Sequence, residues 1–346
     1  MKKSLKFVPY ENHSGFEPDN WPSHVPILPK RHMQILDEAI AGEAPKDFIK
    51  VYEFGRTARK SNPKTWPKYI AKFAKKWYPN ESITEHLLNR LGYILGVRVA
   101  NSRLVRDEEF GRLRFLSEYF LRSSERLEHG AEIFAGYLSD DKLVEELEKD
   151  RRGVRNFFTF QFAEKAIQHR FGHGDEGKNL IRDFVRMLCF DAITGNNDRH
   201  TYNWGIVCDL SGKRAPCFSP VYDSARGLFW NEHEQRLGRF KEKQKDGSTN
   251  LNKYIQESMP RIGWEGVQDP NHFDLAELIY KNYPNYRYIY DETILPEREI
   301  AVNELLEKEF KNLFSATRYF LIKDCLNLRF QNLRNIIDQT KKEERT

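Results

Sequence analysis

Two short stretches of this sequence carry side chains that could hold a metal ion and receive a proton. Residues 195–205 read GNNDRHTYNWG and contain Asp198 with Asn203 five positions later, and a second carboxylate, Asp223, follows downstream. Kinase-type phosphoryl transfer needs one carboxylate to orient a hydroxyl, plus an amide and a second carboxylate to hold Mg²⁺ on ATP. The Asp198–Asn203 spacing equals that of the protein-kinase catalytic loop, although His-Arg-Asp is replaced by Asn-Asp-Arg-His. We therefore interpret Asp198 as a catalytic base and Asn203 and Asp223 as Mg²⁺ ligands.

These residues also have a structural interpretation. A turn Asp often hydrogen-bonds its own backbone, and Asn203 and Asp223 could cap the ends of a hairpin. The oxygen ligands of Asn203 and Asp223 nevertheless suit Mg²⁺ and leave room for water and phosphate. His200 is a poorer candidate ligand, because neutral imidazole binds Mg²⁺ weakly. We expect His200 to brace the loop beside the cofactor through hydrogen bonds.

A lysine and a glutamate upstream complete a possible nucleotide site. Lys72 lies in Tyr-Ile-Ala-Lys-Phe, which resembles the V-A-I-K strand whose lysine contacts ATP phosphates. Glu85 follows thirteen residues later, on the next expected helix, and could pair with Lys72. The alternatives are a solvated strand lysine and a capping box formed by Ser82 with Glu85.

Two further segments are candidates by position alone. The loop 55–65, with one glycine and several Arg and Lys residues, sits where a phosphate-covering loop would be, and Ser61 is its best candidate for self-modification. Glu118 and Phe120 end the last expected strand of this region, where a crossing between lobes would meet adenine. The alternative is that the basic loop and Trp66 bind single-stranded nucleic acid by stacking, but we favour the nucleotide site and expect no direct nucleic-acid binding.

The elements that must position these residues can be placed by periodicity. Strands are expected at 48–54 and 68–73, then a helix from Ser82 that stops at Gly96, then strands at 97–105 and 112–120. Strand, strand, helix, strand, strand is the order of a kinase-like small lobe.

A mainly helical region is expected beyond that lobe. Apolar residues from Ile181 to Ala192 mark a buried helix face that ends at Gly195. A hairpin of 204–208 with 215–219 should then bring Asn203 beside Asp223. The sequence thus predicts an α+β, bilobal fold, with an extension at 1–45 carrying a short helix at 32–40, a small lobe at 46–120, a large lobe at 121–340 and a charged tail at 341–346.

The composition restricts the class of protein. The chain has 56 basic and 51 acidic residues, a mild excess of +5 that fits a nucleotide better than nucleic acid. Four cysteines without disulfide-like spacing fit a reducing compartment, and no apolar run approaches a membrane span. We therefore expect a cytoplasmic protein without membrane contact.

With these motifs in place, the chain resembles HipA-like serine/threonine kinases of the compact, single-chain type over about residues 46–340. The resemblance rests on residues 195–205, on Tyr-Asp at 222–223 and on the strand of Lys72. It implies a protein-kinase-like pair of lobes, ATP and Mg²⁺ as cofactors, Asp198 as base, Asn203 and Asp223 on the metal, and Lys72 on the phosphates. It also implies a toxin or effector that phosphorylates Ser or Thr of a protein, which in some members of the family is a translation factor, and that can have an antitoxin partner.

The chain departs from this family in the loop at 55–65, which is longer and basic, so that autophosphorylation at Ser61 is an open expectation. Residues 232–253 have no evident counterpart and could form an exposed regulatory or docking loop. Three other functions remain open. They are a lipid or small-molecule kinase on the same fold, a metal-dependent phosphohydrolase using Asp198, His200 and Asp223, and a nucleic-acid- or antitoxin-binding module with a degenerate nucleotide site.

Overall fold

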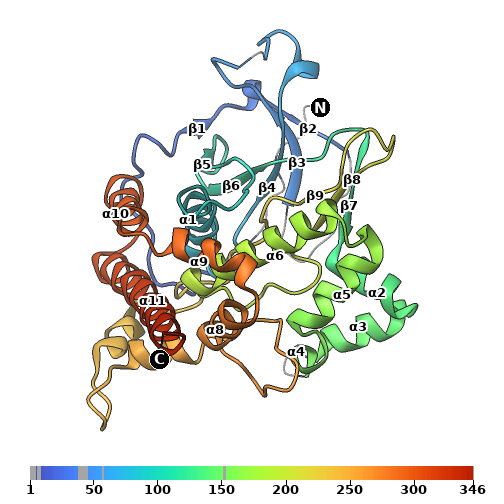
Figure 1. Ribbon diagram of the computed structural model, residues 1–346. Coiled ribbons are helices and arrows are strands. Elements are labelled where there is room, and N and C mark those ends of the chain that lie inside the picture. Colours follow the sequence, from blue (N-terminus) through green and yellow to red (C-terminus); the bar gives the residue numbers. More distant parts are fainter. Residues whose placement is uncertain (1–4, 6–8, 38–45, 57, 151–152, 346) are drawn as a thin grey trace.

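The computed structural model describes residues 5, 9–37, 46–56, 58–150 and 153–345, and it separates into a sheet-rich part and a mainly helical part (Figure 1). The expected α+β class is confirmed. A six-stranded sheet occupies one end, with one long helix, α1, against it, and the other helices gather at the opposite end.

The six-stranded sheet has the order β1-β5-β6-β4-β3-β2. Its strands are β1 (Ile27–Leu28), β2 (Met33–Ile35), β3 (Lys46–Val51), β4 (Lys68–Lys72), β5 (Ser102–Asp107) and β6 (Leu113–Glu118). Only the β1–β5 pair is parallel; the other described pairs of this sheet are antiparallel. The four expected strands of the small lobe are thus present, and residues 27–35 add a short strand at each margin.

The prediction of a short helix at 32–40 is wrong for residues 32–37, which the structure describes. Lys30–His32 form a single 3₁₀ turn, and Met33–Ile35 pair with Ile49–Val51 as β2. The open edge of β3 offers backbone partners that outweigh the weak helical pattern of so short a segment. Residues 38–40 lie outside the described residues.

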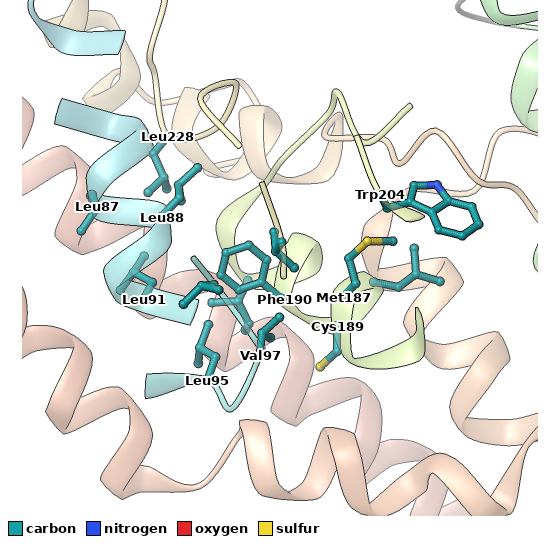
Figure 2. Packing of buried hydrophobic residues seen from close by; sticks show 14 of the residues in the cluster. Leu87, Leu88, Leu91, Leu95, Val97, Met187, Cys189, Phe190, Trp204 and Leu228 are labelled. Atoms are coloured by element: carbon teal, nitrogen blue, oxygen red, sulfur yellow. The ribbon is translucent and has the colours of Figure 1, made fainter. Parts of the chain in front are cut away.

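Helix α1 (Asn80–Ile94) joins the two parts of the molecule. It begins before Ser82, so the expected capping box is wrong and Glu85 lies within the second turn, but the chain does turn left-handed at Gly96 (φ 73°), as expected for a stop. Figure 2 shows Leu88 and Leu91 of α1, and Leu95 just past its end, on the side toward Phe190 of α6 (Asp175–Thr194), and all four belong to one hydrophobic cluster. One hydrophobic core therefore runs through both parts of the chain.

The helical part is built around α6 (Asp175–Thr194), whose apolar spacing predicted it. Residues 119–124 cross into this part from β6 and lead to β7 (Glu125–His129). That strand pairs with β8 (Gly205–Asp209), which pairs with β9 (Cys217–Phe218). The expected hairpin is confirmed, and β7 extends it to a three-stranded sheet. The surrounding helices are α2 (Gly130–Leu138), α3 (Asp141–Lys149), α4 (Val154–Phe157), α5 (Phe160–Phe171), α7 (Asn250–Gln256), α8 (His272–Asn282), α9 (Arg287–Thr293), α10 (Pro296–Leu305) and α11 (Ala316–Glu343).

Residues 232–253 are more ordered than an exposed loop. They contain a 3₁₀ helix, η3 (Glu234–Lys241), whose Leu237 and Phe240 are buried, and they lead into α7. Ser14 contacts this segment, because the Glu234 N–H donates to Ser14 O (2.9 Å). Within the described part of the chain, no helix combines the length and the apolar character that crossing a bilayer requires.

Candidate active site

Lys72, at the end of β4, is held between two carboxylates. Its Nζ lies 2.6 Å from Glu85 Oε1 on α1 and 2.8 Å from Asp223 Oδ1. Lys72 and Glu85 are largely buried, whereas the Asp223 side chain is half exposed. The structure therefore brings together three residues that are far apart in the sequence, and Glu85 is engaged by Lys72 rather than by a helix cap.

Burial and charge act against one another in this group. Lys72 holds the pKa of Asp223 at about 2, well below its ordinary value. Burial raises the pKa of Glu85 to about 7, although the neighbouring ammonium of Lys72 opposes this shift. Burial alone would lower the pKa of Lys72, but the two carboxylates together raise it. Lys72 is thus a fixed cation, while Glu85 titrates near neutral pH.

The loop after α6 places Asp198 and Asn203 together. Asn203 Nδ2 donates to Asp198 O (2.8 Å), which leaves the amide oxygen as the metal-binding atom of Asn203. The Asp198 carboxylate forms ion pairs with Arg226 (3.0 Å) and Arg261 (3.6 Å). Gly195 ends α6 with φ 63°, a conformation that favours glycine. Both arginines were missed by the sequence analysis.

Arg199 ties this loop to the segment that carries Asp223. Its guanidinium forms a bidentate ion pair with the buried Asp191 of α6 (2.9 and 3.0 Å) and also donates to Asn203 O (3.1 Å). On the other side it donates to Tyr222 O (2.8 Å) and Ser224 Oγ (2.9 Å). The buried Arg199 side chain thus holds the backbone at Asn203 and the backbone next to Asp223, so that the two ends of the hairpin lie close together.

A second lysine, Lys46, faces the same region. Lys46 is the antiparallel partner of Lys72, and Phe48 is the partner of Ile70, so these four side chains share one face of the sheet. Burial lowers the pKa of Lys46, and the charge of Lys72 adds to this effect. The strand pattern alone could have identified Lys46, had the register of the hairpin been known.

The apolar residues of this face continue toward the crossing between the two parts. Among the described residues, neither Phe48 nor Ile70 belongs to the two hydrophobic clusters. The Phe48 ring lies 5.0 Å from that of Tyr119, and the Phe120 ring lies 5.9 Å from that of Tyr222. Apolar side chains therefore line this face of the sheet between the lysines and the crossing, and Phe48 among them is buried.

Glu118 ends β6 at the crossing, where its side chain is engaged by neighbours, whereas Ser61 lies away from Lys72. The Glu118 carboxylate accepts hydrogen bonds from Arg56 (2.9 Å) and Asn101 (2.8 Å). Ser61 is exposed in the loop between β3 and β4, which leaves the hairpin at the end opposite Lys72 and projects at the top of Figure 1. At about 3.4 Å per residue, the length of β4 separates the two ends by roughly 14 Å.

His200 lies in the loop that carries Asp198 and Asn203. Its Nδ1 accepts a hydrogen bond from the Tyr202 N–H (3.3 Å), which braces the turn. Burial lowers the pKa of His200, although the Asp198 carboxylate opposes the shift. A neutral imidazole bound to the backbone fits a supporting position better than a metal ligand.

The donor set fits a magnesium ion that is shared with a nucleotide. Within the described ranges, no group of three or more His, Cys, Asp or Glu side chains could hold a metal by itself. Asn203 and Asp223 offer one amide oxygen and one carboxylate, and Mg²⁺ commonly combines one or two protein ligands with phosphate oxygens and water. Asp198 stands beside them, where an acceptor hydroxyl could approach.

Comparisons with known proteins identify the family and the fold of the chain. The family model of the HipA-like C-terminal domain matches residues 39–276. The fold is similar to that of the Helicobacter pylori proinflammatory kinase CtkA, with 15% identity and a TM-score of 0.65 over 89% of this chain and 96% of that one. It is also similar to Shewanella oneidensis MR-1 HipA, solved with HipB and operator DNA, with 16% identity and a TM-score of 0.52 over 88% of this chain and 67% of that one. A search of curated protein sequences found no match. The expected kinase-like fold is thereby confirmed.

Proposed function

The chain belongs to the HipA-like C-terminal domain family, and from this premise we propose that it is an ATP- and Mg²⁺-dependent kinase acting on a serine or threonine hydroxyl of a protein. The observation that carries the proposal is Lys72, held between Glu85 (2.6 Å) and Asp223 (2.8 Å). In kinases the corresponding Lys–Glu pair positions the ATP phosphates, and the carboxylate holds the metal.

Each residue then has a distinct task. Lys72, with Lys46 beside it on the same face, binds the phosphates of ATP, and Asn203 with Asp223 holds Mg²⁺. A magnesium ion held by these two side chains would supply positive charge that offsets the charge of the transferred phosphoryl group. Asp198 orients the acceptor hydroxyl and receives its proton.

The adenine site is proposed on the apolar surface beyond the lysines. Phe48 and Ile70 lie along the strands from Lys46 and Lys72, on the same face, and lead toward Tyr119 and the crossing. A flat, apolar base fits this surface, because ligand sites combine apolar walls with a few polar groups that fix orientation. The nucleotide would therefore lie lengthwise under β3 and β4.

The biological setting is proposed by analogy. HipA of Shewanella is described as part of a toxin–antitoxin system with HipB, and we propose that this chain is a cytoplasmic toxin or effector kinase with an antitoxin partner. Autophosphorylation at Ser61 would require a second copy or a large movement, because the Ser61 loop leaves the hairpin at the end away from Lys72.

Incubation of the purified protein with ATP and Mg²⁺, followed by intact mass and ADP measurement, tests the proposal. We expect turnover in the wild type and none in Asp198→Ala or Asp223→Ala, with Asp246→Ala as a control for loss of an exposed carboxylate away from the site. Substantial transfer by either active-site variant would refute the assignment. A thermal unfolding curve for each variant shows whether it is folded.

A further inference from the structure

Asp198, the proposed base, lies between two arginines that differ in accessibility. Arg226 Nη1 is 3.0 Å from Asp198 Oδ2, and Arg261 Nη2 is 3.6 Å from Asp198 Oδ1. The Arg226 side chain is 33% exposed, whereas that of Arg261 is only 9% exposed. Arg226 is therefore the arginine that a bound ligand can reach.

Arg226 also lies toward the proposed phosphate site. It follows Asp223 by three residues, and the backbone between them is held by the bond from Arg199 to Ser224. Glu81 of α1 lies within the electrostatic range of both Arg226 and Lys72, because both charges act to lower the pKa that burial raises in Glu81. Arg226 thus contacts Asp198 and, like Lys72, lies near Glu81.

An aromatic surface supports the guanidinium. Arg226 Cζ lies 5.5 Å from the centre of the Trp230 ring, within the range of a cation–π contact. Trp77 packs edge-on against Trp230, with ring centres 6.3 Å apart. This contact limits the directions in which Arg226 can point.

The distances permit Arg226 to contact the transferred group without leaving Asp198. A hydroxyl hydrogen-bonded to Asp198 and ready to attack lies about 3–3.5 Å from phosphorus, which brings the phosphoryl oxygens within roughly 6 Å of the carboxylate. The guanidinium carries five N–H donors in a planar fork. One edge can remain on Asp198 while another donor faces a phosphoryl oxygen.

We infer that Arg226 is a further catalytic residue of the proposed kinase, one that contacts the phosphoryl group during transfer; this inference rests on the proposed function. In the step, the acceptor oxygen forms a bond to the γ-phosphorus of ATP, and the bond from that phosphorus to the bridging oxygen breaks. Asp198 receives the hydroxyl proton, and ADP leaves with the electron pair of the broken bond. Arg226 stabilises the negative charge on the non-bridging oxygens, for which kinase-type sites need a cation.

The test compares Arg226→Gln, Arg226→Lys and Arg226→Ala with Arg239→Gln, which removes an arginine paired with Glu232 outside the site. ADP formation and mass gain are measured with ATP and Mg²⁺ alone, and ATP affinity is measured by equilibrium binding. Loss of one donor to a transition-state oxygen typically lowers kcat by about 10²–10³-fold. We expect that loss in Arg226→Gln, a smaller loss in Arg226→Lys, and an ATP Kd changed by less than about threefold, since the contact forms mainly in the transition state.

A second readout separates catalysis from support of the fold. Millimolar guanidinium ion should partly restore turnover in Arg226→Ala but not in Asp198→Ala, because only the former lacks a guanidinium. Unchanged or faster turnover in Arg226→Gln would overturn the inference and leave Arg226 as a group that merely masks Asp198. A loss of ATP binding that matches the loss of rate would also overturn it. If the wild-type protein neither binds nor turns over ATP, the proposed function fails first, and this inference fails with it.

Discussion

Replacing Arg199 with methionine should lower the free energy of unfolding by about 3–5 kcal/mol, the usual cost of leaving one partner of a buried ion pair alone. The side chains of Arg199 and Asp191 are 2% and 1% exposed, so water cannot take the place of the lost guanidinium. After the substitution, the hydrogen bond from Asn196 (3.2 Å) is the one that the Asp191 carboxylate keeps among the described side chains. The acceptors on Asn203 and Tyr222 also lose a donor, at about 1 kcal/mol each.

The assay is urea unfolding at pH 7 followed by circular dichroism, for Arg199→Met, Asp191→Asn and the double variant. The double variant should recover about 1–3 kcal/mol relative to Arg199→Met, because it no longer contains a buried, unpaired charge. Arg239→Met, which removes an arginine outside this network, should change the free energy by no more than about 0.5 kcal/mol.

The pH dependence has a definite sign. Burial already raises the pKa of Asp191, and the loss of Arg199 removes the charge that opposes this shift. A carboxyl group whose pKa is raised in the folded state contributes stability when protonated and loses it as pH rises. The deficit of Arg199→Met should therefore shrink as pH falls toward the ordinary pKa of Asp. A deficit below about 1 kcal/mol at pH 7, or a double variant no more stable than the single one, would refute the reasoning.

The remaining predictions concern the strands and helices around the site. Glu85, whose pKa is about 7, must lose its proton to form the ion pair with Lys72. We therefore expect kcat/KM to rise between about pH 6 and 8 in the wild type, and we expect this rise to be absent in Glu85→Gln. Gly195→Ala should cost about 1–3 kcal/mol in urea unfolding because φ is 63°, whereas Gly136→Ala on an exposed helix face should stabilise by up to about 1 kcal/mol. Lys46→Ala should weaken ATP binding by about tenfold, a loss of about 1.4 kcal/mol, whereas Ser61→Ala should leave the Kd within about twofold; equal effects of the two would contradict the site proposed here.

The long periodic elements and the chemical motif could be predicted from the sequence. The buried face of α6 follows directly from its apolar spacing, and the pattern that contains Asp198 and Asn203 lies immediately after it. A hairpin brings its ends together whatever its details, so the approach of the Asn203 and Tyr222 backbones, which Arg199 joins, could be anticipated. These inferences depend on neighbours in the sequence.

What the sequence did not reveal depends on distant partners. Arg226 and Arg261 reach Asp198 from segments 28 and 63 residues downstream, and arginines at such distances carry no local signal. β2 is three residues long, too short for alternation to distinguish it from a helix. Lys46 could not be identified as a phosphate-binding candidate from the sequence, because its position beside Lys72 depends on the pairing of β3 with β4. The basic residues of 55–65, which the sequence suggested instead, lie at the other end of the hairpin.

The margins of the six-stranded sheet limit how this protein can be shortened. A clone starting at Lys46 would lack β1 and β2, which flank β5 and β3 on opposite sides. The strands β5 and β3 would then become the edges of the sheet and would expose unpaired backbone amides to other molecules. Such exposed edges commonly lead to aggregation. Removal of α11 would be equally harmful, because Arg329 on that helix donates to Ala192 O (2.8 Å) at the end of α6. Useful expression fragments should therefore keep both terminal segments.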